Sequence, residues 1–308
     1  MEYRRLGRSG LVVSAVGLGT VLFGKHVDED RTRAIIDQAL DLGVTFIDTS
    51  DSYADGASET LIGKILGARR HEIVLATKFS SPMGPAPWQR GTSRHWLMRE
   101  VEDSLRRLGT DVIDLYQIHH PDPLTPIEET LRGLDDLVAA GKVRYVGYSN
   151  VAAWQIVDGQ WTARTEQLVR PISTTNHFNL ARRDAEAEIL PAVRAHGLGI
   201  IPYYPFESGF LTGRYRPDQK PEGIRLTRSP REAAVLTPAN FARLERWEAF
   251  AAEHGRSMVE LAVGWLLSHP EVGSVIAGAS SPDQVRSTVE SATWRLAATE
   301  MEAVAAIS

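Results

Sequence analysis

Short apolar runs alternate with segments of helical period along most of the chain. The runs are rich in β-branched residues, whereas the segments between them repeat apolar residues every three or four positions, as at Leu97, Val101 and Leu105. Strands buried on both faces of a parallel sheet read as unbroken apolar runs, and crossover helices separate them. Eight such runs occur, at residues 16–19, 45–48, 73–78, 113–119, 143–149, 171–178, 198–204 and 274–278.

This alternation predicts an α/β fold, a (β/α)8 TIM barrel. A length of 308 residues also allows two ordinary domains, but barrels of about 250 residues form one domain, and we expect one over 1–308. Residues 3–16 look like two short strands around Gly7 to Gly10, a β-hairpin capping the barrel floor. Two long loops, 79–93 and 205–238, follow strand ends and should lie on the C-terminal rim, where barrel active sites form.

Composition excludes several classes of protein. The formal net charge of −5 gives no basic field for nucleic acid. The start has no signal-peptide core, and no run approaches the ~18 apolar residues of a membrane span, so we expect a soluble cytoplasmic protein. The chain has no cysteine, and its histidines show no metal-ligand spacing, so no metal site is expected. The oligomeric state stays open.

Four polar residues stand at or just beyond the ends of consecutive predicted strands. Asp48, Lys78 and His119 end runs, and Tyr53 follows Asp48 by one short loop. Any one alone is equally consistent with a solvated side chain, but adjacent parallel strands would bring all four together, as a proton-transfer site requires. We expect Asp48 to hold Lys78, Lys78 to lower the Tyr53 pKa from about 10, and His119 to hydrogen-bond a substrate oxygen. This set suits proton transfer at a carbonyl oxygen, and a hydride carrier must supply the electrons.

Several segments resemble the signatures of the aldo-keto reductases. They are "FIDTSDSYADGASETLIGK", "LATK", "SLRRLGTDVIDLYQIHHPD", "GKVRYVGYSN", "YYPFESGFLTGRY" and "VIAGASSPDQV", and the resemblance runs from about Arg4 to about Val289. It implies a (β/α)8 barrel that binds NADPH, less often NADH, across its rim. It also implies a catalytic tetrad, which falls on Asp48, Tyr53, Lys78 and His119.

The resemblance also implies a set of cofactor contacts. Ser149 and Asn150 would hold the nicotinamide carboxamide, Tyr203 would stack on its ring, and Thr175 stands where the family usually has glutamine. The loop that would bind the adenosine phosphate, residues 278–284, has no Arg or Lys. We therefore expect only a modest preference for NADP(H), with NAD(H) as the other candidate. The full implied set is Gly19, Thr20, Asp48, Ser149, Asn150, Thr175, Tyr203, Ser208, Gly209, Leu211, Arg214, Gly278, Ser280 and Gln284.

These features predict an NAD(P)H-dependent oxidoreductase that reduces an aldehyde or ketone to an alcohol. We expect its small-molecule substrate, a sugar or an aromatic carbonyl compound, to bind in an aromatic pocket of Phe23, Phe79, Trp88 and Phe206. One alternative is an enoyl (C=C) reductase acting on a sugar-type substrate, against which His119 argues, because such relatives carry glutamate there. Another is a non-catalytic, cofactor-sensing regulatory subunit like the potassium-channel β-subunits. A lysine Schiff-base aldolase is a weaker alternative, since Lys78 is expected to pair with Asp48. Ser58 and Glu59 are expected to cap the second helix.

Overall fold

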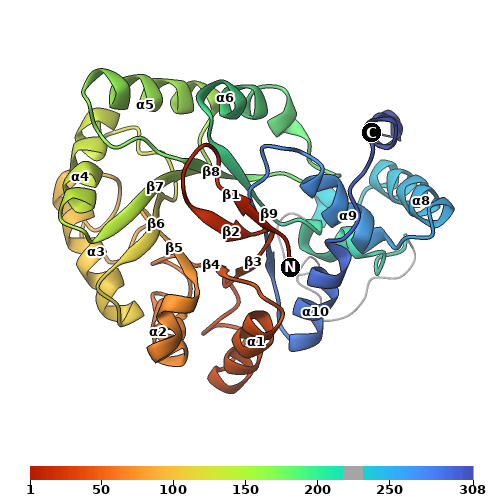
Figure 1. Cartoon of the computed structure of the whole chain (residues 1–308), viewed down its shortest axis with the longest axis horizontal. Coiled ribbons are helices and arrows are strands. Elements are labelled where there is room, and N and C mark those ends of the chain that lie inside the picture. Colours follow the sequence, from red (N-terminus) through yellow and green to blue (C-terminus); the bar gives the residue numbers. More distant parts are fainter. Residues whose placement is uncertain (218–231, 308) are drawn as a thin grey trace.

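The computed structural model describes residues 1–217 and 232–307. Within these residues, eight parallel strands close into a barrel in the order β10-β3-β4-β5-β6-β7-β8-β9 (Figure 1). This confirms the predicted (β/α)8 barrel, with strand ends within two residues of the predicted ones. The barrel strands are β3 (Val16–Gly19), β4 (Phe46–Asp48), β5 (Val74–Phe79), β6 (Ile113–Ile118), β7 (Val143–Ser149), β8 (Ser173–His177), β9 (Gly199–Tyr203) and β10 (Val275–Gly278).

Helices surround the barrel and bury their apolar faces against its outer surface (Figure 1). In α3, Leu97, Val101 and Leu105 are buried as their spacing predicts. This helix begins where the Ser93 hydroxyl accepts from the Trp96 backbone N–H. The α-helices are α1 (Glu29–Asp41), α2 (Ala57–Leu66), α3 (Arg94–Leu108), α4 (Ile127–Ala139), α5 (Ala153–Thr165), α6 (Ile189–His196), α7 (Glu232–Val235), α8 (Pro238–Glu253), α9 (Met258–Leu267), α10 (Pro282–Ser291) and α11 (Ala298–Ile307), and the 3-10 helices are η1 (Gly67–Glu72), η2 (Asp184–Glu186) and η3 (Glu207–Thr212).

The N-terminal hairpin closes the floor of the barrel, as predicted. Strands β1 (Tyr3–Arg5) and β2 (Val12–Ser14) pair antiparallel and lie across the barrel centre (Figure 1). Leu6 and Val13 pack with the inward-facing side chains of the barrel. Gly7 adopts φ +59°, and a Cβ there would lie 2.6 Å from the Gly197 carbonyl oxygen, so only glycine fits this close approach. The hairpin therefore leaves the opposite end of the barrel as the open one.

The loops after the strands carry unusual backbone conformations. Non-glycine residues with positive φ include Ser80, Asn150 and Tyr204, each directly after the C-terminal end of a strand, and Ser208 inside η3. Such conformations cost of order 1–3 kcal/mol each and cluster at functional sites. The second predicted long loop contains η3 and α7, and its residues 218–231 lie outside the described residues.

The expected capping role of Ser58 and Glu59 is wrong. Helix α2 begins at Ala57, and its N-cap residue is Gly56, which has φ +87° and makes no side-chain cap. Glu59 is fully buried and accepts a 2.6 Å bond from Arg107 Nε, while the Ser58 hydroxyl lies 3.0 Å from Thr20 Oγ1. Both side chains point inward and bond residues outside α2, so neither of them caps the start of the helix.

Candidate active site

The ammonium of Lys78 lies at the centre of the polar groups on the open rim. Strands β4 and β5 pair in register, so Lys78 near the end of β5 meets Asp48 at the end of β4. Its Nζ donates to Asp48 Oδ1 at 2.5 Å, to the Thr49 carbonyl oxygen at 2.8 Å and to the Tyr53 hydroxyl at 3.4 Å. Burial acts to lower the pKa of Lys78, but the Asp48 carboxylate and the Tyr53 hydroxyl together outweigh it and the net shift is upward. Lys78 therefore stays charged although it is buried.

A chain of hydrogen bonds inside the barrel holds the other oxygen of Asp48. Gln117 Nε2 donates to Asp48 Oδ2 at 3.1 Å, and Gln117 Oε1 accepts from the Thr175 hydroxyl at 2.7 Å. All three side chains are buried. The sequence analysis missed Gln117, although the signal was present as a lone amide in the apolar run "IDLYQIH". Since both carboxylate oxygens are bonded, Asp48 is fixed in one orientation.

The phenol of Tyr53 lines the cleft beside this ion pair. Burial raises its pKa above 10, the Lys78 ammonium acts to lower it, and the Asp48 carboxylate acts to raise it. The net shift is upward, so the expectation that Lys78 brings this pKa below its usual value is wrong. Burial outweighs the ammonium because the Asp48 carboxylate offsets part of the Lys78 charge. Tyr53 consequently keeps its proton at neutral pH, which is the form that donates to an oxygen.

His119 faces Tyr53 across the cleft, with ring centroids 5.9 Å apart and nearly perpendicular. Its Nδ1 lies 3.0 Å from Ser50 Oγ and 3.2 Å from Ser81 Oγ, so two hydroxyls fix the ring. Burial, together with the Lys78 charge and His120, lowers the pKa of His119 to about 2. The imidazole is therefore neutral at physiological pH, and it can orient an oxygen by a hydrogen bond but does not deliver a proton as imidazolium.

The structure brings much of the predicted site into one cleft of about 270 Å³. The predicted residues that line it are Asp48, Tyr53, Lys78, His119, Gly19, Thr20, Ser149, Asn150, Thr175, Tyr203 and Gly278. His120 and Tyr204 also line it, together with Val21, Pro205 and Ile276, which the sequence analysis did not single out. The latter three are apolar residues in or beside strand ends, and nothing in their local pattern separates them from core residues.

Polar groups on the β7 side of the cleft fit a carboxamide-bearing ring. Asn150, in a left-handed conformation, donates to the His119 carbonyl oxygen at 2.9 Å and to Ser149 Oγ at 3.0 Å. Its Oδ1 accepts from the Tyr203 hydroxyl at 2.7 Å. The ring of Tyr203 stacks on His177 and also lines the cleft. Amide, hydroxyl and aromatic groups at this wall are suited to holding a nicotinamide flat.

The more distant predicted cofactor residues do not line this cleft. Ser208 and Gly209 form a left-handed kink inside η3, Leu211 is buried in the core, and Arg214 is exposed. At the start of α10, the backbone N–H of Ser280 donates to Gln284 Oε1 at 2.7 Å, and the Ser280 hydroxyl lies 3.1 Å from the same oxygen. An anion that used the Ser280 donors would have to replace this amide.

The four residues of the predicted aromatic pocket do not line this cleft. Phe23 and Phe79 are fully buried in the layer between barrel and helices, where Phe79 stacks on Tyr116 at 4.7 Å. Phe79 follows Lys78 directly, and successive strand residues point to opposite faces, so it faces away from the cleft. Trp88 is 54% exposed, and Phe206 packs against the core beneath η3 and α9. None of the four lines the cleft, whose aromatic side chains are Tyr53, His119, His120, Tyr203 and Tyr204.

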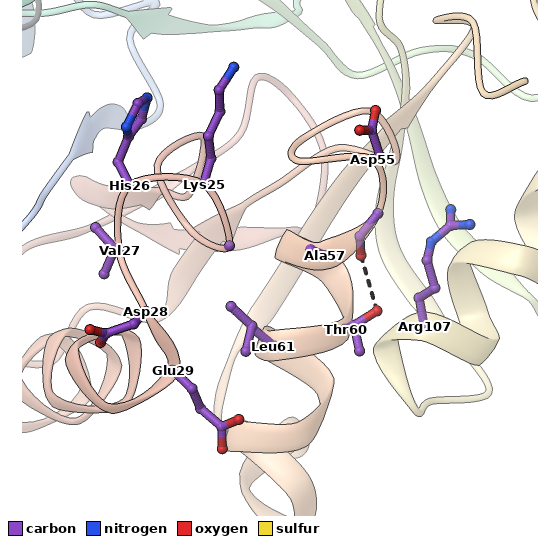
Figure 2. A pocket seen from close by; sticks show the side chains of 12 residues that line it. Lys25, His26, Val27, Asp28, Glu29, Asp55, Ala57, Thr60, Leu61 and Arg107 are labelled. Carbon is purple, nitrogen blue, oxygen red and sulfur yellow. Dashed lines mark hydrogen bonds between the residues drawn. The ribbon is translucent and has the colours of Figure 1, made fainter.

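A wider hollow of about 730 Å³ lies between the loop before α1 and the start of α2 (Figure 2). It is lined by side chains of both charges, including Lys25, Asp28 and Asp55, and it contains none of the tetrad. Glu29 on its edge pairs with Lys64 at 2.6 Å. The narrower cleft, which gathers the titratable groups, is therefore the candidate active site.

No group of three or more His, Asp or Glu side chains in residues 1–217 and 232–307 is arranged to hold a metal ion. In the same part of the chain, the helices are too short or too polar to cross a membrane.

Comparison with known proteins agrees with the geometry of the cleft. Residues 15–308 match the model of the aldo/keto reductase family. The chain belongs to this family. It is 36% identical over 302 residues to the uncharacterized oxidoreductase YrpG of Bacillus subtilis (strain 168). The aligned region covers 94% of this chain and 90% of that relative. It is 33% identical over 306 residues to L-glyceraldehyde 3-phosphate reductase of Escherichia coli O157:H7, over 94% of this chain and 87% of that enzyme.

A third relative of this aldo/keto reductase is named for a different role. A probable voltage-gated potassium channel subunit beta of Oryza sativa subsp. japonica is 34% identical over 293 residues, over 92% of this chain and 89% of that protein. Family membership supports an oxidoreductase that uses a nicotinamide cofactor.

Proposed function

We propose that this aldo/keto reductase reduces aldehydes or ketones to alcohols with an NAD(P)H cofactor and Tyr53 as the general acid. The observation that carries the proposal is the contact of one buried ammonium, Lys78, with both Asp48 and the Tyr53 hydroxyl inside the cleft. A protonated phenol beside a fixed positive charge is suited to giving its proton to an oxygen that gains negative charge.

The roles of the four residues follow from their contacts. A bound nicotinamide supplies the hydride that reduces the carbonyl carbon. Tyr53 donates its proton to the carbonyl oxygen, and the nearby Lys78 stabilises the phenolate that remains. Asp48 keeps Lys78 charged and in place. Neutral His119 orients the substrate oxygen toward Tyr53, and oxidation of an alcohol uses the same groups in reverse.

Turnover of 4-nitrobenzaldehyde with NADPH tests the proposal. We expect Tyr53→Phe to lower kcat by about 10²–10⁴-fold, the usual contribution of a positioned acid. Tyr3→Phe is the matched control, because the Tyr3 hydroxyl is exposed and bonds only the Gly43 carbonyl oxygen on the floor side. A Tyr53→Phe enzyme with full activity would rule out Tyr53 as the acid.

We further propose a modest preference for NADPH over NADH. Ser280 and Ser281 present hydroxyl and backbone donors at the start of α10, where the helix dipole favours an anion such as a 2′-phosphate. Residues 278–284 contain no Arg or Lys, so the phosphate gains no charged partner there. The ratio of kcat/KM for the two cofactors checks this, and a ratio favouring NADH contradicts it.

The lining of the cleft favours a hydroxylated or aromatic carbonyl substrate. Tyr204 and His120 add rings and polar atoms beside His119, and such groups stack on sugars and hydrogen-bond their hydroxyls. The name of the Escherichia coli relative, a reductase of a small phosphorylated aldehyde, is consistent with this class. Comparing sugar aldehydes, aromatic aldehydes and simple alkanals at equal concentration tests it; equal kcat/KM for all three would contradict the proposal.

A second candidate function is a cofactor-sensing subunit of a membrane complex, which the similarity to the rice protein favours. The two functions differ in turnover. Nicotinamide binding with negligible reduction of every carbonyl tested, together with co-purification of a membrane protein, would support the subunit. Reduction of an enoyl substrate in place of its saturated carbonyl analogue would instead support the C=C reductase alternative.

A further inference from the structure

Helix α5 carries apolar side chains on both its inner and its outer face. Ile156 and Ala163 are buried against neighbouring elements, as expected for a helix of the barrel wall. On the outer face, Trp154 is 66% exposed, Val157 44% and Trp161 63%. In Figure 1 this helix lies at the outer edge of the barrel, between α4 and α6. The outer face is therefore a hydrophobic surface that barrel packing does not explain.

The exposed residues form one continuous stripe. Trp154, Val157 and Trp161 are spaced by three and four positions, so they lie above one another along one side of the helix. Tryptophan is among the residue types most enriched at protein interfaces, and two of them about two turns apart on one helix face are unusual on a free surface. We define Trp154, Val157, Asp158, Trp161 and Arg164 as the α5 stripe.

Two opposite charges on the stripe are placed symmetrically about Trp161. Asp158 precedes it by three residues and Arg164 follows it by three. Both are exposed, and within the described part of the chain neither takes part in an ion pair. A second α5 laid antiparallel across the first, with a two-fold axis at Trp161, brings each Asp158 opposite the Arg164 of the other copy. It also places Trp161 against its own counterpart and Val157 against Thr165.

We propose that the α5 stripe is a two-fold interface through which two copies of this chain associate. A self-complementary patch of this kind is what a two-fold dimer requires, since the same surface serves both copies. A tryptophan buries about 150–250 Å², so four of them exposed to nearly two-thirds contribute roughly 400–650 Å². Stable interfaces bury about 1,200–2,000 Å² in total, so the stripe by itself supports only a weak dimer.

Charge reversal in trans tests the pairing directly. In sedimentation velocity of the full chain from about 1 to 200 μM, we expect reversible dimerisation. Asp158→Arg or Arg164→Asp alone should weaken dimerisation by about tenfold or more, because each substitution turns both attractive contacts of the dimer into contacts between like charges. An equimolar mixture of the two variants should associate again as a heterodimer, since every charge then meets its opposite. Rescue by mixing occurs only if these two residues face one another between copies.

Controls separate the interface from folding and from catalysis. Arg99→Asp, an exposed charge reversal on α3, should leave the dimer unchanged, and carbonyl turnover should be the same in all variants. The proposal is overturned by a chain that remains monomeric throughout the concentration range. It is also overturned by a dimer that neither single reversal weakens, by single variants that weaken the dimer without rescue on mixing, or by binding of the stripe to lipid vesicles without self-association.

Discussion

Removal of the buried positive charge should separate the structural from the catalytic role of Lys78. Lys78→Met keeps the length of the side chain but leaves the Asp48 carboxylate buried without its cation. The ion pair is almost inaccessible, with 2% exposure of each side chain, and the ammonium makes three hydrogen bonds. Breaking such a pair by removing one partner costs about 3–5 kcal/mol.

This free energy converts into a measurable shift in melting temperature. With an unfolding entropy of about 2.1 cal/mol/K per residue, a chain of 308 residues loses roughly 5–8 °C for 3–5 kcal/mol. The double variant Asp48→Asn, Lys78→Met removes both charges and keeps an oxygen that can accept from Gln117. We expect it to recover about half or more of the lost stability, because a neutral amide is far cheaper to bury than a lone carboxylate. Its turnover should stay as low as that of the single variant.

Two assays test this prediction for the Lys78 variants. Thermal unfolding followed by circular dichroism measures stability, and reduction of 4-nitrobenzaldehyde measures kcat. If Lys78→Met unfolds at the wild-type temperature, or if the double variant is no more stable than the single one, the ion pair is not the constraint that we describe.

Three further predictions concern His119, the support of Asp48 and the start of α10. Because the pKa of His119 is lowered to about 2, the fold should lose stability as pH falls below about 6.5, where the unfolded imidazole binds a proton. In thermal unfolding, His119→Gln should lose less stability than the wild type over this range. A wild-type pH profile of kcat/KM with a break from an imidazole near 6.5 would contradict the shift. Gln117→Leu should destabilise the fold by about 1.5–3 kcal/mol and lower kcat, since it removes a donor from the Asp48 carboxylate; Gln38→Leu, at an exposed amide, is its control in urea unfolding. Ser280→Arg should raise the preference for NADPH over NADH by about tenfold or more, by giving the 2′-phosphate a charged partner; an unchanged ratio of kcat/KM would place the phosphate elsewhere.

The sequence predicted the barrel well because its signal is repeated. Each of the eight strands reads as an apolar run, and helical segments such as α3 and α9 place their buried residues at the expected spacing. The pairing of Asp48 with Lys78 was predictable for the same reason, since neighbouring parallel strands bring their ends together. Both predictions rest on regular geometry, in which position along the chain fixes position in space.

Predictions that depended on side-chain direction or on the sum of opposing effects were less successful. Phe79 was expected in the pocket, but it follows the inward-facing Lys78 and therefore points to the helices. The pKa of Tyr53 depends on burial, on Lys78 and on Asp48 at once, and the residue types alone do not reveal which is largest. Glu59 looked like a helix cap because its partner, Arg107, is 48 residues away along the chain. Each of these outcomes is set by three-dimensional packing that a local pattern does not contain.

The position of Thr175 links the departure from the family pattern to the stability of the ion pair. The family usually has a glutamine there, which would reach toward the nicotinamide, whereas the shorter threonine is buried and donates to Gln117. Gln117 in turn donates to Asp48, so the hydroxyl of Thr175 acts on the orientation of the carboxylate. Contacts to a carboxamide would then fall to the wall formed by Ser149 and Asn150, which is already ordered by its own hydrogen bonds. We therefore propose that threonine at this position supports Asp48, which holds Lys78 beside Tyr53, in place of binding the cofactor.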